Sequence, residues 1–290
     1  MSTPCRCRPP DGSDTYTTST AFLEALAEAG VRYVFANLGS DHPGLIEALA
    51  QFDAEASAAL AGGASPPSAV GSSPRASRVP QLIVCPHETV ALSAAHAYAT
   101  VTRRPQAVLV HVDAGTQNLG GAVSNAMRGR VPVLIFAGAA PFTMAGEHPA
   151  GRNEFIHWIQ DVPDQRGILR GYVKYDNEIR TGRNVKQLVH RALQLARTEP
   201  AGPVYLVGPR EVMEEPVEPY TVDPAQYPPA VTSSSTGSRT SATSAASCAA
   251  TSSTTTRSAR AATSSRSSTG PCRSHAASRP ARFTWSPPVR

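Results

Sequence analysis

Residues 80–99 read PQLIVCPHETVALSAAHAYA, an apolar run joined directly to a helical pattern of small residues. The run at 81–85 predicts a strand buried on both faces of a sheet, and the pattern from residue 89 to about 101 predicts a helix. A strand that leads straight into a helix is typical of parallel α/β sheets. Glu88 lies where the two meet, so a carboxylate is expected at the carboxyl end of a buried strand.

The same alternation of apolar runs and helical patterns continues through the chain up to about residue 220. Further strands are predicted at 31–38, 107–112, 131–138 and 203–208, and further helices at 20–30, 43–52, a stretch ending at 127, and 184–197. Ser19 or Thr20 can cap the first helix, Gly30 can end it, and Pro43 can begin the second. A Gly/Asn-rich loop is expected from Asp113. The fold class is therefore α/β, a parallel sheet with helices on both faces.

Composition divides the chain into an ordered domain and flanking segments. Of the residues 231–290, 47 of 60 are Ser, Thr, Ala or Arg, with no Asp, Glu or Lys. Such a segment buries too little apolar surface to offset its conformational entropy, so 221–290 is expected to be a disordered tail. We expect a flexible N-terminus at 1–16 and the α/β domain at 17–220, with a Ser/Ala/Gly/Pro-rich loop insertion at 54–80. The abrupt change after Pro229 is typical of a wrong reading frame or a retained intron.

Charge, cysteine spacing and hydropathy disfavour several classes of protein. The chain carries +5 and its last 60 residues hold eight Arg and no acids, so residues 1–230 carry 5 − 8 = −3. Nucleic-acid binding by the folded part loses its main support. Cys5 and Cys7 lack the spacing of a zinc site, and Cys85 is expected to be a buried thiol. No run of about 18 apolar residues predicts a membrane span. A cytoplasmic location is expected, with a mitochondrial one left open.

Polar side chains follow three of the predicted strands, where parallel sheets collect their ligands. They are Ser40, Asp41 and His42 after the first strand, Glu88 after the second, and His111 with residues 113–118 after the third. Because these strand ends meet at one edge of the sheet, the side chains are expected to converge there. This convergence predicts a functional site.

Four blocks follow one another along the chain: FANLGSDHP, CPHETVALSAAHAYA, HVDAGTQNLGGAVSNAMRGRVPVLIFAG and GPVYLVGP. In this order they resemble the N-terminal pyrimidine-binding domain of thiamine diphosphate enzymes. The resemblance covers about residues 17–218 and is nearest to the acetolactate synthase, benzoylformate decarboxylase and oxalyl-CoA decarboxylase group. It implies thiamine diphosphate as cofactor, which acts on a 2-oxo acid or acyl-CoA substrate.

The resemblance also assigns roles to individual residues. Glu88 would hydrogen-bond a ring nitrogen of the aminopyrimidine and help to move its proton, and His111 would assist proton transfer near the reacting carbon. Ser40 would contact the substrate, and Gly115, Thr116 and Asn118 would border the pyrimidine. Each residue type also has an ordinary structural role. An acid in a first helical turn favours the dipole, a histidine can be satisfied at a strand end, and Ser after Gly is common in turns.

The chain departs from the family's three-domain pattern. It contains no Gly-Asp-Gly sequence, the start of the motif that holds magnesium and the diphosphate in complete members. We therefore expect only the pyrimidine half of the cofactor to bind, with Mg²⁺ ligands absent, and no decarboxylation or carboligation by this chain alone. The family builds its active site between subunits, so a homo-oligomer or pairing with a full-length subunit is expected. The alternative is a non-catalytic module that binds or regulates an intact enzyme.

Overall fold

The computed structural model describes residues 15–61 and 78–230 of the 290-residue chain. Residues 1–14 of the expected flexible N-terminus, 62–77 of the insertion and 231–290 of the expected tail lie outside the described residues. Residues 221–230, expected to belong to the disordered tail, are instead ordered, with a 3-10 turn at Pro224–Gln226 and a hydrogen bond from Gln194 Nε2 to Pro228 O at 2.7 Å. Within the described residues, six strands form one sheet in the order β2-β1-β3-β4-β6-β5, with every pair parallel. The strands are β1 (Tyr33–Ala36), β2 (Gln81–Val84), β3 (Gln106–Val110), β4 (Val133–Ala139), β5 (Asp176–Glu178) and β6 (Val204–Pro209).

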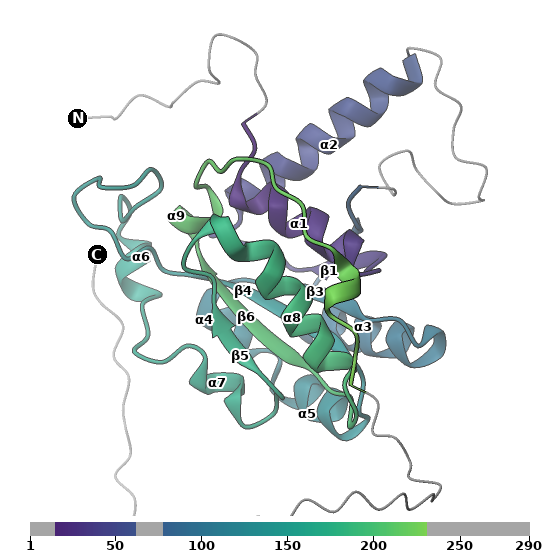
Figure 1. Ribbon diagram of the computed structural model, residues 1–290. Coiled ribbons are helices and arrows are strands. Elements are labelled where there is room, and N and C mark those ends of the chain that lie inside the picture. The colour runs from purple at the N-terminus through teal and green to yellow at the C-terminus, as the bar shows by residue number, and fades with distance from the viewer. Residues whose placement is uncertain (1–14, 62–77, 231–290) are drawn as a thin grey trace, which may run out of the picture. The chain divides into compact units, whose positions relative to one another are not determined.

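Helices cover both faces of this sheet (Figure 1). One face packs against α1 (Thr18–Glu28), α2 (Pro43–Ala61), α8 (Val185–Arg197) and α9 (Arg210–Met213). The other face packs against α3 (Glu88–Thr102), α5 (Gly120–Arg128) and α7 (Gly167–Arg170). Two short helices, α4 (Val112–Gln117) and α6 (Ile156–Ile159), follow the carboxyl ends of β3 and β4. The predicted α/β fold with helices on both faces is confirmed.

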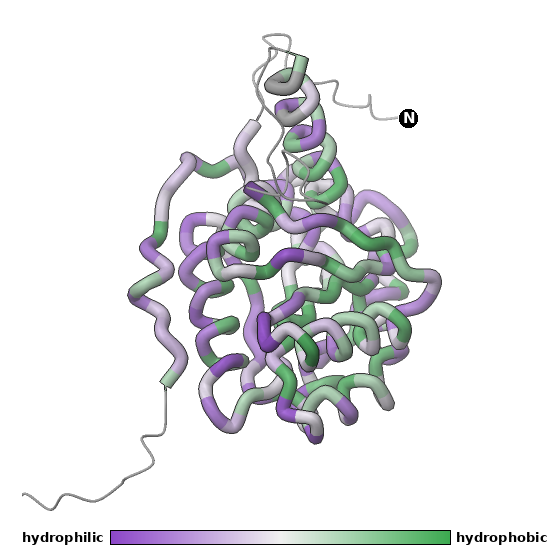
Figure 2. The backbone as a smooth tube through the Cα atoms, turned by 90° about the vertical axis from the view of Figure 1, so that its right-hand side faces the viewer, coloured by the Kyte–Doolittle hydropathy of each residue, from purple (hydrophilic) through white to green (hydrophobic). Residues whose placement is uncertain are grey.

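Alternation within the central strands explains why both faces are apolar. Leu134 and Phe136 of β4 enter the core beneath α1 and α8, whereas Val133 and Ile135 enter the core beneath α3. Since successive side chains of a strand point to opposite faces, a strand covered on both sides must be apolar throughout. The helices need only one apolar side, and the tube in Figure 2 changes between green and purple along their turns.

The first helix begins slightly earlier than the sequence predicts. Its N-cap is Thr17, whose side chain accepts from the backbone N–H of Thr20, while the Thr20 side chain accepts from the N–H of Thr17. This reciprocal capping box satisfies two of the donors that a helix start leaves unpaired. The prediction of a cap at Ser19 or Thr20 is therefore wrong, because both residues are already helical. Gly30 does end this helix, at φ +87°, in the left-handed region that glycine occupies without strain.

The structure corrects three further expectations. Strand β2 is an edge strand with Val84 70% exposed, not a strand buried on both faces. Helix α2 continues to Ala61, so the segment 54–61 is helical and not part of a loop insertion. The expected Gly/Asn-rich loop from Asp113 is helix α4. The short strand β5 was not predicted from the sequence.

A buried cation joins the two helices that lie side by side on the first face. Lys186 of α8 is 2% exposed, and its Nζ lies 2.9 Å from Glu24 Oε2 and 2.8 Å from Glu28 Oε1 of α1. Two carboxylates compensate the charge that burial would otherwise penalise. Among the helices of residues 15–61 and 78–230, none is long and apolar enough to span a membrane.

Candidate functional site

The carboxyl ends of β2, β1 and β3 bring the predicted polar residues to one edge of the sheet. Asn37 and Asp41 follow β1, Glu88 follows β2, and His111 follows β3. Because these three strands are neighbours and parallel, the residues that follow them lie next to one another. The structure thus brings together the side chains on which the sequence-based site depends.

Glu88 is held between two side-chain amides. It is the first residue of α3 and is 5% exposed. Its Oε1 accepts from Asn37 Nδ2 at 3.0 Å, and its Oε2 accepts from Asn118 Nδ2 at 3.0 Å. Glu88 does occupy a first helical turn, where a carboxylate interacts favourably with the helix dipole. Its hydrogen bonds, however, come from side chains that follow β1 and α4, which fix the carboxylate in place against the sheet edge.

Gly115 lets the Glu88 carboxylate lie close against the backbone. A methyl group added at Gly115 would lie 3.1 Å from Glu88 Oε1 and 3.3 Å from Val110 Cβ, which is tighter than ordinary van der Waals contact. The missing side chain therefore allows the buried carboxylate to pack directly on the backbone of α4. The Asn118 backbone closes the other side, since its carbonyl accepts from Thr89 Oγ1 at 2.6 Å.

A second pair, Asp41 and His111, lies beside this carboxylate. His111 Nδ1 is 2.5 Å from Asp41 Oδ1, and the Val112 N–H donates to Asp41 Oδ2 at 3.0 Å. The Asp41 side chain is only 4% exposed, and that of His111 is 24% exposed. The imidazole therefore has a fixed orientation, with Nδ1 toward the buried carboxylate and Nε2 toward the outside.

The same contacts shift the proton affinities of this pair. The hydrogen bond to Asp41 raises the pKa of His111 above its ordinary value, against the opposing effect of burial. Burial raises the pKa of Asp41, but His42 and the hydrogen bond from His111 outweigh it and hold that pKa well below the ordinary value. The geometry thus favours an imidazolium next to a carboxylate.

The backbone around Asp41 is adapted to its position. A side chain at Gly138 of β4 would overlap the Asp41 carboxylate, so only glycine leaves room for it. Val112, which donates to Asp41, has φ +27°. A β-branched residue with positive φ costs about 1–3 kcal/mol and occurs where the surrounding structure enforces it.

Ser40 and Gln160 extend the site toward solvent. The Gln160 Nε2 lies 2.8 Å from His111 Nε2, and Gln160 lines a narrow crevice together with Ser40 and Asp41. His157, 2% exposed, lines the same crevice, and its Nδ1 has no hydrogen-bond partner among the described residues. Burial lowers the pKa of His157, which favours a neutral ring. The crevice is too narrow for a water molecule, so this buried nitrogen could gain a partner only if the crevice opens.

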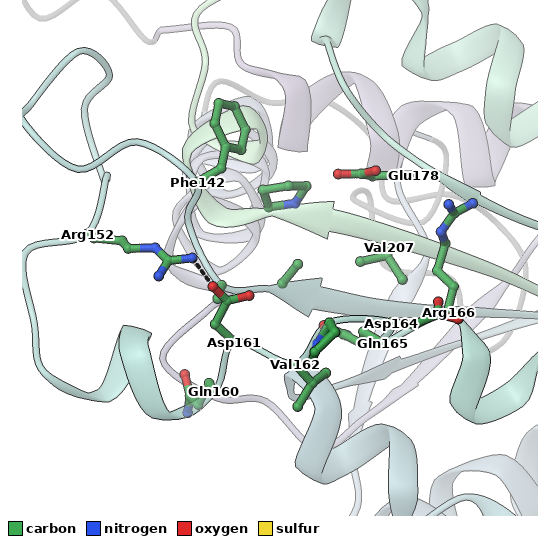
Figure 3. A pocket seen from close by; sticks show the side chains of 14 residues that line it. Phe142, Arg152, Gln160, Asp161, Val162, Asp164, Gln165, Arg166, Glu178 and Val207 are labelled. Atoms are coloured by element: carbon green, nitrogen blue, oxygen red, sulfur yellow. Dashed lines mark hydrogen bonds and ion pairs between the residues drawn. The ribbon is translucent and has the colours of Figure 1, made fainter.

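A larger cavity of about 260 Å³ adjoins this crevice at the carboxyl ends of β4, β5 and β6. The two share Ala139, Ala140 and Gln160 in their walls. The close-up in Figure 3 labels its polar lining, including Asp164, Arg166 and the ion pair between Arg152 and Asp161. Glu88 does not line this cavity, but Gln160 does, and Gln160 contacts His111.

Thr116 is separated from the other predicted site residues. It is fully buried, and its Oγ1 donates to Val112 O at 2.6 Å and lies 2.9 Å from the Tyr205 hydroxyl. Its side chain therefore belongs to the core between α4 and β6 and leaves only backbone atoms for the predicted pyrimidine contact. The sequence reasoning also missed Asn37 and Gln160 and gave Asp41 no role. The place of Asn37 and Asp41 directly after a strand was the one available signal.

The described residues contain no group of three or more His, Cys, Asp or Glu side chains placed to hold a metal ion. The site described above is built from one buried carboxylate, two amides and a carboxylate–imidazole pair. This donor set suits hydrogen bonding and proton transfer to an organic group.

Comparison with known proteins shows which family and which relatives the chain is similar to. Residues 69–168 match the family described as thiamine pyrophosphate enzyme, N-terminal TPP binding domain. The chain is 28% identical over 146 residues to 2-hydroxyacyl-CoA lyase 2 of Danio rerio, covering 50% of this chain and 21% of that protein. It is 29% identical over 130 residues to benzoylformate decarboxylase of Pseudomonas aeruginosa, covering 45% and 23%.

A third relative is the acetolactate synthase large subunit of Lactococcus lactis, 30% identical over 132 residues, covering 46% of this chain and 21% of that protein. The chain thus spans about a fifth of the length of these relatives.

Solved structures agree with the fold. The 4-hydroxybenzoylformate decarboxylase of Rhodococcus jostii, described as thiamine diphosphate-dependent, matches with a TM-score of 0.53 and 21% identity. The match covers 73% of this chain and 33% of that one. Benzoylformate decarboxylase of Polynucleobacter necessarius matches with a TM-score of 0.53 and 20% identity, covering 71% and 32%. The family resemblance expected from the sequence is confirmed.

Proposed function

Because the chain carries the N-terminal TPP-binding domain of the thiamine pyrophosphate enzymes, we propose that it binds thiamine diphosphate through the pyrimidine half of that cofactor. The proposal places this domain in an acetolactate synthase-like 2-oxo acid decarboxylase or carboligase. One observation carries it: the Glu88 carboxylate is 5% exposed, fixed by two amides and bordered by a glycine.

The residues around Glu88 fit a planar heterocycle with ring nitrogens. Each carboxylate oxygen has more than one lone pair, so an oxygen that accepts from Asn37 or Asn118 can still accept a second hydrogen bond. The absence of a side chain at Gly115 lets Oε1 lie against the backbone of α4. In this dry position Glu88 would hold or share a proton at a ring nitrogen of the pyrimidine, while the two asparagines keep its carboxylate oriented. The bound cofactor would supply the electron sink for carbanion chemistry.

His111 is the second proton carrier in this proposal. Asp41 raises the pKa of His111, so the imidazolium form persists to higher pH than it does in an isolated histidine. Nδ1 is held by Asp41, which leaves Nε2 as the nitrogen that exchanges a proton with a substrate. Gln160 Nε2 lies 2.8 Å from this Nε2 and can donate to it only while Nε2 carries no proton, so a substrate that exchanges a proton with Nε2 would displace Gln160.

The proposed substrate is a 2-oxo acid or an acyl-CoA. Ser40, His157 and Gln160 line the closed crevice beside His111, and their neutral hydrogen-bonding groups would meet a carbonyl or carboxylate once that crevice opens. The adjoining cavity adds the guanidinium groups of Arg152 and Arg166. We further propose pairing with a second copy or with a longer subunit of the same family, which would provide the magnesium and diphosphate contacts. The family match favours this enzyme domain over a regulatory module.

Saturation-transfer NMR with thiamine diphosphate tests the proposal on the full chain. We expect transfer from the protein to the pyrimidine protons, and strong reduction of that signal in Glu88→Gln. The matched control is Glu47→Gln, because Glu47 is an exposed residue of α2 on a different part of the domain. Equal transfer in wild type and Glu88→Gln would contradict the proposal, as would transfer confined to the diphosphate-bearing side chain.

A further inference from the structure

Another pocket, distinct from the crevice and the cavity described above, lies at the opposite edge of the sheet, at the amino ends of β4 and β6. It has a volume of about 260 Å³ and is lined by the ends of α3, α5 and α8 and the loops that follow them. We call it the amino-edge pocket. Its charged lining consists of Arg103, Arg130, Arg197 and Glu199. Because every strand is parallel, this pocket is separated from the Glu88 site by the length of the sheet.

The three guanidinium groups of the amino-edge pocket, those of Arg103, Arg130 and Arg197, form no ion pair within residues 15–61 and 78–230, although Glu199 lines the same pocket. Arg197 is half-buried, and its Nε donates only to the carbonyl of Leu193 in its own helix at 3.3 Å. Burial lowers the pKa of Arg197. Glu199 accepts from the backbone N–H of Ala201 at 3.2 Å.

Helix termination does not account for these arginines. Arg103 follows α3 at φ 59° and Arg130 follows α5 at φ 52°, both in the left-handed region where helices usually end on glycine. An arginine there costs about 1 kcal/mol relative to glycine. A cation near a helix C-terminus interacts favourably with the dipole. An arginine in the last helical turn would give the same benefit without adopting a positive φ. Neither side chain donates a hydrogen bond to the last carbonyls within the described part of the chain.

The charge at this pocket is opposite to that of the domain around it. Residues 1–230 hold 19 Lys or Arg and 22 Asp or Glu, 19 − 22 = −3, yet the pocket gathers three arginines and one glutamate. Guanidinium groups form bidentate, charge-assisted hydrogen bonds that match the geometry of phosphate oxygens. We propose that the amino-edge pocket binds a small phosphate-bearing anion, away from the cofactor site. Its volume suits a phosphate group with a short organic portion rather than a whole dinucleotide.

Isothermal titration with inorganic pyrophosphate tests the proposal on the full chain. The perturbation is the double variant Arg103→Gly/Arg130→Gly, because glycine is the residue that both left-handed positions favour and folding is retained or improved. We expect pyrophosphate to bind the wild-type chain and the dissociation constant to rise at least tenfold in this variant. A urea unfolding midpoint equal to or above that of the wild type would show that the loss is local.

Two controls separate this pocket from other sources of anion binding. Arg180→Gln/Arg191→Gln removes the same charge from exposed positions elsewhere, and Glu88→Gln perturbs the cofactor site. Both should bind pyrophosphate as the wild type does, and all variants keep the same arginine-rich segment 231–290. Absence of binding by the wild type would overturn the proposal. So would an equal loss in the charge-matched control, or an unchanged constant in Arg103→Gly/Arg130→Gly.

Discussion

Replacing Asp41 by Asn tests whether the carboxylate–imidazole pair is built as described. The carboxylate accepts from His111 Nδ1 at 2.5 Å and from the Val112 N–H at 3.0 Å, and only 4% of the side chain is exposed. Asn keeps the shape and one oxygen acceptor but removes the charge. Hydrogen bonds to charged groups contribute about 1.5–3 kcal/mol, so we expect the free energy of unfolding to fall by about 2 kcal/mol. For a domain of this size that is about 4–8 °C in Tm.

The pH dependence of this loss has a definite sign. His111 has a raised pKa, so its contribution to stability is complete below about pH 6.5, the unfolded value, and is lost as pH rises through the folded value. Asp41 has a lowered pKa, so its contribution is complete above about pH 4 and is lost as pH falls toward the folded value. The difference between wild type and Asp41→Asn should therefore be largest between about pH 4 and 6.5 and shrink above it.

Urea unfolding at several pH values measures this difference, and imidazole NMR titration measures the pKa of His111 directly. We expect the His111 midpoint to fall toward its ordinary value in Asp41→Asn. Glu47→Gln, at an exposed position of α2, serves as a control that removes one acid without touching the pair. A stability difference that stays constant from pH 5 to 8, together with an unchanged His111 midpoint, would refute the reasoning.

Two further substitutions probe the packing. Gly138→Ala places a methyl group into the Asp41 carboxylate, so we expect a loss of about 1–3 kcal/mol by urea unfolding, against little change in Gly171→Ala, where nothing lies within 4 Å. Lys186→Met leaves the two glutamates of α1 facing each other without their buried cation, and we expect about 3 kcal/mol lower stability. Surface substitutions usually change the free energy of unfolding by no more than about 0.5 kcal/mol. A variant whose free energy of unfolding stays within that range of the wild type would contradict the expectation for it.

The central strands and their helices could be predicted because each carries a complete local signal. The apolar run of β4 and the Pro43 start of α2 act through side-chain type alone. Strand β5 has only three residues, Asp176–Glu178, and none is apolar. It forms because its backbone pairs with β6. Backbone pairing leaves no periodic pattern of apolar residues in the sequence, so this strand could not be predicted. Helix α4 was missed because Gly115 is a poor helix former whose place is set by its tertiary contacts with Glu88 and Val110.

The site, like the fold, contains residues that the sequence predicts and residues that only tertiary contacts bring into place. Glu88 and His111 could be predicted because each follows a strand, and parallel strands end at one edge. Their partners Asn37 and Gln160 could not, since side-chain amides are common in loops and become informative only when the fold sets their distances. Gln160 is the clearest case. It reaches His111 from the end of α6, 49 residues further along the chain, in a segment without a helical or strand period.

Calorimetric titration of the full chain with thiamine diphosphate tests the central claim, that a buried Glu88 carboxylate binds the cofactor's pyrimidine. The account predicts measurable binding by the wild-type chain and by Glu47→Gln. Glu88→Gln should bind about tenfold or more weakly, the equivalent of one charge-assisted hydrogen bond. Equal affinity of Glu88→Gln and the wild type, or no heat of binding with either, would contradict it.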